Sequence, residues 1–175
     1  MTDTTTAADV RPERTYTVTA ADVKDGQYVG SEIDTAFGVV LEGHLDIAAG
    51  LGWVRFVRLC VRGRIRALAG SGIKAGSGIK AGWGIKAGSG IEAGSGIEAG
   101  EGIEAGWGIT AGLSITCAAD LHTTHRVFAG LAIWKAAVTE EESRVTCRAF
   151  HGILAFGALV ETDKATAGAA TEKTA

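Results

Sequence analysis

The chain has 175 residues, of which 46% are hydrophobic and 21% charged, and its formal net charge is −3. This length fits one compact domain, and the composition excludes a chain that is disordered throughout. The near-neutral charge disfavours a general nucleic-acid binder, and the 26 glycines do not recur at every third position, as collagen requires.

Residues 1–14 and 162–175 are rich in Thr, Ala and charged residues, and we predict that both form flexible tails. The first residues lack the basic and then apolar layout of a signal peptide, and the longest apolar run is far shorter than the roughly 20 residues that cross a bilayer. The three cysteines are odd in number and form no CxxC pair or Cys/His cluster. We therefore expect reduced thiols in the cytoplasm and no metal ion, cofactor or membrane contact.

A degenerate six-residue pattern precedes a regular repeat. Its expected inward pairs are Leu45-x-Ile47, Leu51-x-Trp53, Val57-x-Leu59 and Gly63-x-Ile65. The phase of this pattern differs by two residues from that of the regular block. The difference predicts a bulge or an irregular corner near residues 67–70.

From Gly70 to Cys117 the chain consists of eight consecutive six-residue units, GSGIKA, GSGIKA, GWGIKA, GSGIEA, GSGIEA, GEGIEA, GWGITA and GLSITC. A helix is excluded because this period spreads the isoleucines over several faces, and a flexible linker has no recurring isoleucine. In an extended Ile-x-Ala segment the outer residues share one face, so Ile and Ala are expected to line a core. Gly-x-Gly then forms a corner, because glycine accepts backbone angles that other residues resist. A competing frame turns Ser-x-Ile inward, which would bring Trp83 and Glu101 into the core.

The residue between Ile and Ala changes type after every third unit: Lys at 74, 80 and 86, Glu at 92, 98 and 104, then Thr at 110 and 116. With three sides per coil, each Lys lies beneath the Glu 18 residues later, at the spacing of neighbouring strands. Two sides per coil would instead stack Lys74 beneath Lys86. We therefore predict an all-β fold: a single-stranded parallel β-helix over residues 41–117, a triangular solenoid of about 18 residues per coil.

A solenoid leaves open strand edges at both ends, which have to be covered. We assign this role to residues 15–40, with strand-like stretches at Thr15–Thr19 and Ala36–Leu41, and to residues 118–161. Within the second cap, Val145–Val160 is expected to form a hairpin or added strands.

The GxGIxA units resemble the hexapeptide repeats of left-handed parallel β-helix proteins, over about residues 41–117. That family includes trimeric acyltransferases, and the resemblance implies a histidine on or beside the coils and acyl-CoA bound between subunits. The coils from Val61 to Cys117 depart from this pattern, because they contain no histidine and no long loop interrupts them. The regular, short units also resemble small uncharacterised proteins of phages and prophages, and some small phage proteins block host defences such as CRISPR systems.

Two tryptophans occupy corner positions of the repeat, Trp83 and Trp107. We predict them as contact anchors, because tryptophan is frequent at binding hot spots, with packing on a cap or a neighbouring subunit as the alternative. Alternating arginines precede the regular block and predict an outward basic patch, formed by Arg62, Arg64 and Arg66. Such a patch suits an acidic protein surface, a nucleotide or a phosphate backbone; the alternative is a solvated face that balances the acidic coils.

The later coils carry an acidic pole, formed by Glu92, Glu98, Glu101 and Glu104. It either imitates nucleic-acid phosphates or is neutralised by the lysines of the earlier coils. Two histidines, His122 and His125, are the candidates for chemistry. A histidine that acts as a base needs an orienting carboxylate and a pocket. A pair of histidines that binds a metal needs further ligands, and only Asp120 is near in the sequence. The alternative interpretation is that both histidines lie in a polar surface loop.

The expected function is that of a non-enzymatic β-solenoid that binds a protein partner through its tryptophan corners and charged faces. It would act as a phage-type regulator or inhibitor of a host defence such as a CRISPR complex; nucleic acid is a less favoured partner. One alternative is an acyltransferase-like enzyme that uses His122 or His125. Another is a structural or assembly protein that stacks into homo-oligomers.

Overall fold

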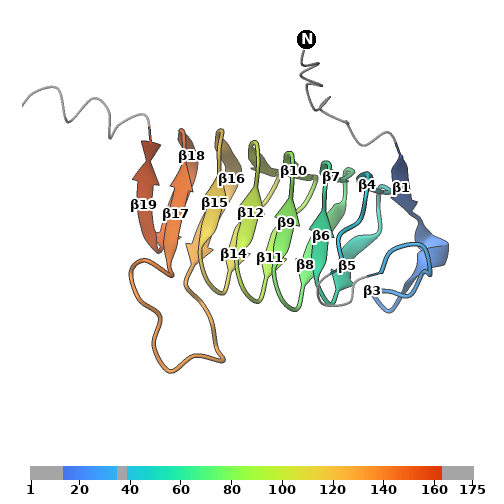
Figure 1. Ribbon diagram of the computed structural model, residues 1–175, viewed down its shortest axis with the longest axis horizontal. Coiled ribbons are helices and arrows are strands. Elements are labelled where there is room, and N and C mark those ends of the chain that lie inside the picture. The colour runs from blue at the N-terminus through green and yellow to red at the C-terminus, as the bar shows by residue number, and fades with distance from the viewer. Residues whose placement is uncertain (1–13, 35–38, 163–175) are drawn as a thin grey trace, which may run out of the picture.

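The computed structural model describes residues 14–34 and 39–162, and it consists of three ladders of short strands that follow one long axis (Figure 1). The strands pair in parallel, except for one short antiparallel pair between Val23–Lys24 and Gln27–Tyr28. The chain visits the ladders in turn and adds one strand to each of them per coil. The predicted all-β class and the parallel β-helix are therefore confirmed. We name the three ladders face 1, face 2 and face 3.

Face 1 contains β1 (Thr15–Val18), β4 (His44–Ile47), β7 (Ile65–Ala67), β10 (Ile85–Ala87), β13 (Ile103–Ala105) and the first half of β16 (Leu121–Ala129). Face 2 contains β2 (Val23–Lys24), β3 (Gln27–Tyr28), β5 (Gly52–Phe56), β8 (Ser71–Ala75), β11 (Ile91–Ala93), β14 (Ile109–Ala111) and the second half of β16. Face 3 contains β6 (Leu59–Val61), β9 (Ile79–Ala81), β12 (Ile97–Ala99), β15 (Ile115–Cys117), β17 (Arg144–Cys147) and β19 (Ala158–Glu161). Strand β18 (Phe150–Phe156) pairs with β16, and a single 3-10 turn, η1 (Ala20–Asp22), precedes β2.

The core is a column of isoleucine and alanine, as the Ile-x-Ala frame predicts. All eight repeat isoleucines are at most 1% exposed, and each contributes about 1.5–3 kcal/mol by burial. The competing frame is wrong, because Glu101 is exposed and Trp83 lies half-buried at a corner rather than in the core.

The predicted coil of 18 residues is confirmed in the regular block, where Ile85 pairs with Ile103. Each predicted Lys–Glu pair is in register, and the Nζ–Oε distances are 2.5 Å for Lys74–Glu92, 2.7 Å for Lys80–Glu98 and 2.8 Å for Lys86–Glu104. Each of these exposed pairs adds only about 0.2–1 kcal/mol to the free energy of unfolding. Their contribution is to the choice of register, because a coil shorter by one unit would stack Lys74 on Lys86.

The predicted inward pair Leu51-x-Trp53 is wrong. Strand β5 turns Val54 and Phe56 inward and leaves Trp53 37% exposed. The cause is a long corner before β5, where Gly50 and Gly52 adopt the left-handed φ angles of 75° and 64° that favour glycine. This corner shifts the strand relative to a strict six-residue period.

The next two predicted pairs, Val57-x-Leu59 and Gly63-x-Ile65, are also wrong, each by two residues. The inward pairs are Leu59 with Val61 and Ile65 with Ala67, while Val57 is 61% exposed. The irregular corner predicted near residues 67–70 is confirmed, with Gly70 at a φ of 74°. Its extra residues lengthen that coil to 20, the separation of the paired Ile65 and Ile85.

The reason expected for the Gly-x-Gly corners is wrong. Between Gly72 and Gly112 no glycine has a positive φ, so these corners need no special backbone angle. The glycines are required by the close approach of neighbouring coils instead. A Cβ atom at Gly78 would lie 3.2 Å from the carbonyl oxygen of Gly96, and one at Gly82 would overlap the carbonyl oxygen of Arg62.

The parallel ladders continue on both sides of residues 41–117. Strand β1 pairs with β4, and β17 and β19 extend face 3 as added parallel strands, so Val145–Val160 forms no hairpin. The predicted tails lie outside the described residues at 1–13 and 163–175, as do residues 35–38 of the expected strand Ala36–Leu41. Within the described part of the chain, no helix has the length and apolarity to cross a membrane.

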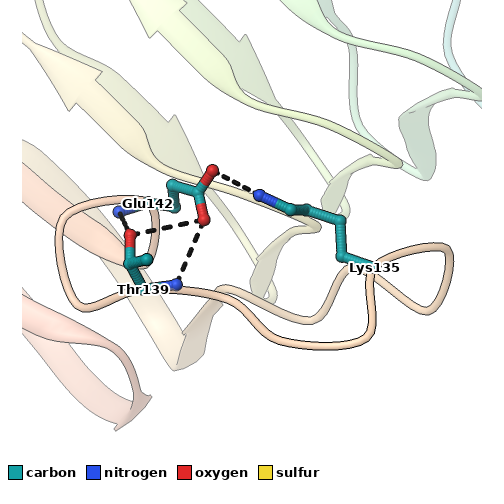
Figure 2. A network of polar contacts seen from close by, with 3 residues as sticks. All are labelled: Lys135, Thr139 and Glu142. Carbon is teal, nitrogen blue, oxygen red and sulfur yellow. Dashed lines mark hydrogen bonds and ion pairs between the residues drawn. The ribbon is translucent and has the colours of Figure 1, made fainter.

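One corner of the last coils is enlarged into a loop, residues 130–143, which projects from the column between β16 and β17 (Figure 1). Figure 2 shows a cross-link within the loop: the Glu142 carboxylate pairs with Lys135 and accepts a 3.1 Å hydrogen bond from the backbone N–H of Thr139. The indole N–H of Trp134 donates to the carbonyl of Gly94 at 3.1 Å, which holds the loop against the column. Ile133 of this loop is fully exposed.

Candidate functional site

The repeat produces a furrow on every face. The second glycine of each Gly-x-Gly stands directly before the repeat isoleucine, and successive coils stack these glycines into a column. Having no side chain, the column leaves a channel between the corner residues on one side and the mid-strand residues on the other. On face 1 the glycines are Gly84 and Gly102, and on face 3 they are Gly78 and Gly96.

The furrow of face 1 forms a larger hollow than the furrow of face 3, and the two differ in their corner residues. It has a volume of about 570 Å³, against about 260 Å³ for the furrow of face 3. The corner positions that border it are Trp83 and Glu101, whereas face 3 has Ser77 and Ser95 at the equivalent positions. We define the face-1 groove by its floor and its eight charged or aromatic lining residues: Gly84, Gly102, Arg64, Arg66, Trp83, Lys86, Glu101, Glu104, Asp120 and His122.

Charge changes sign along the face-1 groove. Its N-terminal end carries Arg64 and Arg66, which share the Asp46 carboxylate at 3.6 Å and 2.6 Å. Its C-terminal end carries Asp120, which pairs with Arg148 at 2.9 Å, and Glu101. Within residues 14–34 and 39–162, the exposed Glu101 carboxylate has no ion-pair partner, so it is available to a ligand.

The Trp83 side chain of the groove is held by a contact with His44. Its ring packs against the imidazole of His44, with the ring centroids 4.8 Å apart. His44 is itself buried and accepts a 3.1 Å hydrogen bond at Nδ1 from the backbone N–H of Arg64. Burial, assisted by the Arg64 charge, lowers the pKa of His44 below its ordinary value and favours the neutral ring that accepts this bond.

The structure brings five of the nine predicted contact residues together in this groove: Arg64, Arg66, Trp83, Glu101 and Glu104. The other four lie elsewhere. Arg62 pairs with Glu42 at 2.5 Å, and Glu92 and Glu98 stand on faces 2 and 3 beside their lysines. Trp107 is 60% exposed at the corner between faces 1 and 2.

Two groove residues, Lys86 and Asp120, were not predicted as site residues, and neither were the acids that neutralise the arginines. Glu42 and Asp46 precede Arg62 and Arg66 by 20 residues, which is one coil of the irregular region. The sequence does contain an acid 20 residues before Arg62 and another 20 residues before Arg66. These acid–arginine pairs can be predicted only when the coil length at that position is known.

His122 lines the C-terminal end of the groove, where its ring stacks on that of His151 with a centroid distance of 4.1 Å. His125 lies on the same strand but away from the groove, and its backbone N–H donates to the carbonyl of Trp107 at 3.4 Å. In the described ranges, no group of three or more His, Cys, Asp or Glu residues is placed to hold a metal ion.

The two buried thiols, those of Cys117 and Cys147, are poor nucleophiles. Burial raises the pKa of Cys117 to about 12 and that of Cys147 to about 11, so both stay protonated at neutral pH. They serve as small apolar groups in the core of face 3, where Cys117 takes the place of the repeat alanine.

Comparison with protein-family models, curated proteins and solved structures finds no match for this chain. The regular succession of short parallel strands is a property of the structure itself. The likeness to hexapeptide-repeat enzymes and to phage proteins stays a prediction.

Proposed function

We propose that the protein is a non-enzymatic β-solenoid that binds a protein partner through the face-1 groove. One observation carries the proposal: a tryptophan packed against His44, a cationic end and an anionic end converge on one hollow of about 570 Å³. Protein segments present apolar, cationic and anionic groups together, whereas a phosphate backbone presents one sign of charge.

The rigidity of the scaffold favours such a role. The strands that border the groove, β7, β10 and β13, pair with one another in parallel on face 1. Trp83 packs against His44. A surface that is already ordered loses little conformational entropy when a partner binds. A phage-type inhibitor of a host defence complex, the role suggested by the style of the repeat, would act through such a surface.

The test is an affinity capture from a bacterial lysate, followed by titration of the captured and purified partner. Trp83→Ala and Glu101→Lys are expected to weaken binding about tenfold or more, because each alters the groove. Trp107→Ala and Glu98→Lys are the matched controls, since they change the same residue types outside the groove. Equal affinity for all four variants would reject the proposal.

One observation favours the enzymatic alternative: His122, a predicted candidate base, lines the same groove. An acyltransferase-like enzyme would bind acyl-CoA saturably and lose this binding on His122→Ala. That result would replace the proposed function. No saturation by acyl-CoA, with partner binding intact, would remove the alternative.

The assembly alternative rests on the last coil, where Ile153 is 59% exposed and Phe156 is 51% exposed. Apolar side chains of this size are frequent at interfaces between protein chains. Light scattering that gives a single chain mass at every concentration would exclude this alternative.

A further inference from the structure

Face 2 shows what a glycine furrow of this solenoid accommodates. The indole of Trp53 lies across two glycines of its own column, Gly72 and Gly90. A Cβ atom at Gly72 would stand 2.9 Å from the six-membered ring, and one at Gly90 would stand 2.8 Å from it. The bare backbone of the two glycines is therefore covered by a planar aromatic ring.

The face-1 groove has the same floor without the ring. Gly84 and Gly102 occupy the same place in their repeat units as Gly72 and Gly90, directly before the repeat isoleucine. The residue in the position of Trp53 is Arg64, whose guanidinium is drawn toward Asp46 at 3.6 Å. The glycine floor of face 1 thus stays open.

We propose that the face-1 groove takes a planar aromatic side chain of the partner, a tryptophan or tyrosine, laid flat on Gly84 and Gly102. This inference rests on the proposed function and specifies the group that is recognised. The mode of binding repeats what Trp53 does on face 2 within the chain.

The sides of the groove complement such a ring. Trp83 supplies an aromatic neighbour at the edge of the floor, and aromatic pairs gain from offset or edge-to-face contact. The Glu101 carboxylate stands on the same side and can accept an indole N–H or a phenol O–H. A branched aliphatic side chain has no flat face to set against the floor and no donor for that carboxylate.

The probe is a blocked pentapeptide, acetylated and amidated, with the sequence Gly-Glu-Trp-Lys-Gly, and the same peptide with Leu in place of Trp. Binding to the full chain is followed by the amide NMR signals of Gly84 and Gly102. We expect saturable shifts of both signals with the Trp peptide and binding about tenfold weaker or more with the Leu peptide.

The decisive variant is Gly84→Ala, which places a methyl group on the groove floor. Its Cβ would lie 3.2 Å from the carbonyl oxygen of Gly102, and Gly78→Ala on face 3 has the same 3.2 Å approach to the carbonyl of Gly96. The two variants therefore share their effect on the backbone, and equal thermal stability checks this. Gly84→Ala is expected to weaken the Trp peptide about tenfold, and Gly78→Ala to leave its affinity unchanged.

The outcomes separate this inference from the proposed function. If Trp83→Ala abolishes partner binding while Gly84→Ala does not, or if the Trp and Leu peptides bind equally, the aromatic inference is overturned and the proposed function stands. If neither the protein partner nor the Trp peptide engages the groove, both are rejected.

Discussion

Gly82 and Gly76 occupy the same place in two successive repeat units, yet their surroundings differ. A Cβ at Gly82 would overlap the carbonyl oxygen of Arg62 in the preceding coil. A Cβ at Gly76 would lie 3.4 Å from the carbonyl oxygen of Val57, an ordinary contact. The difference arises because Gly76 stacks on the shorter corner between β5 and β6.

Gly82→Ala is therefore expected to lower the free energy of unfolding by about 1–3 kcal/mol, the usual cost of forcing atoms into a packed region. Gly76→Ala is expected to change it by less than about 1 kcal/mol, or to raise it slightly, because alanine restricts the unfolded chain. Urea unfolding measures both. Equal effects would show that backbone approach is not what requires glycine here.

His44 gives the fold a dependence on pH. Its pKa is lowered in the folded state by burial and by Arg64, so the unfolded chain binds a proton at a higher pH than the folded chain. Stability from the neutral ring is then fully present above the ordinary value of 6.5 and is lost as the pH falls from there toward the folded-state pKa.

We expect the melting temperature of the wild type to fall more than that of His44→Gln between about pH 7.5 and about pH 5.5. His125→Gln, which alters an exposed histidine, is the control and should follow the wild type. Parallel pH profiles for wild type and His44→Gln would contradict the role given to this ring.

At the scale of the strand, the sequence predicts strand positions best where the six-residue repeat is regular. The strands from β8 to β15 were predictable because isoleucine recurs in all eight units and the charge between Ile and Ala changes sign with an 18-residue period over the first six. Strand β5 was not, because its phase depends on how many residues the corner at Gly50 and Gly52 absorbs. The groove was half predictable for the same reason: its residue types are visible in the repeat, but their alignment with Asp46 and Asp120 is set by coils of unequal length.

Within the loop of residues 130–143, the segment from Lys135 to Glu142 is cross-linked by one carboxylate (Figure 2). Glu142 holds both Lys135 and the Thr139 backbone, and these contacts lower the pKa of its carboxyl. Glu142→Gln is expected to speed amide hydrogen exchange across the loop while the melting temperature hardly changes, because exposed ion pairs add little to global stability. Glu140→Gln, a neighbouring exposed change, is the control, and equal exchange in both variants would contradict the role of Glu142.

At the scale of the whole molecule, the protein is a stack of coils in which each coil contacts its neighbours through three ladders. The core column and the glycine contacts repeat in each coil. One regular coil can therefore be removed so that the next coil takes its place. Removing residues 88–105 deletes β11, β12 and β13, one strand from each face. Gly108 then takes the place of Gly90 beneath Trp53, and each remaining isoleucine still stacks on an isoleucine or its equivalent.

The chain without residues 88–105 is therefore expected to fold and to unfold cooperatively in urea, with a smaller dependence on denaturant because less surface is buried. Removing residues 88–96 instead is expected to abolish the cooperative transition, since Ile97 would follow Ala87 directly and no corner would separate the two strands. Circular dichroism and urea unfolding distinguish the two deletions. Loss of folding in both would mean that the coils are not interchangeable, and cooperative folding in both would mean that the core does not require the six-residue corner spacing.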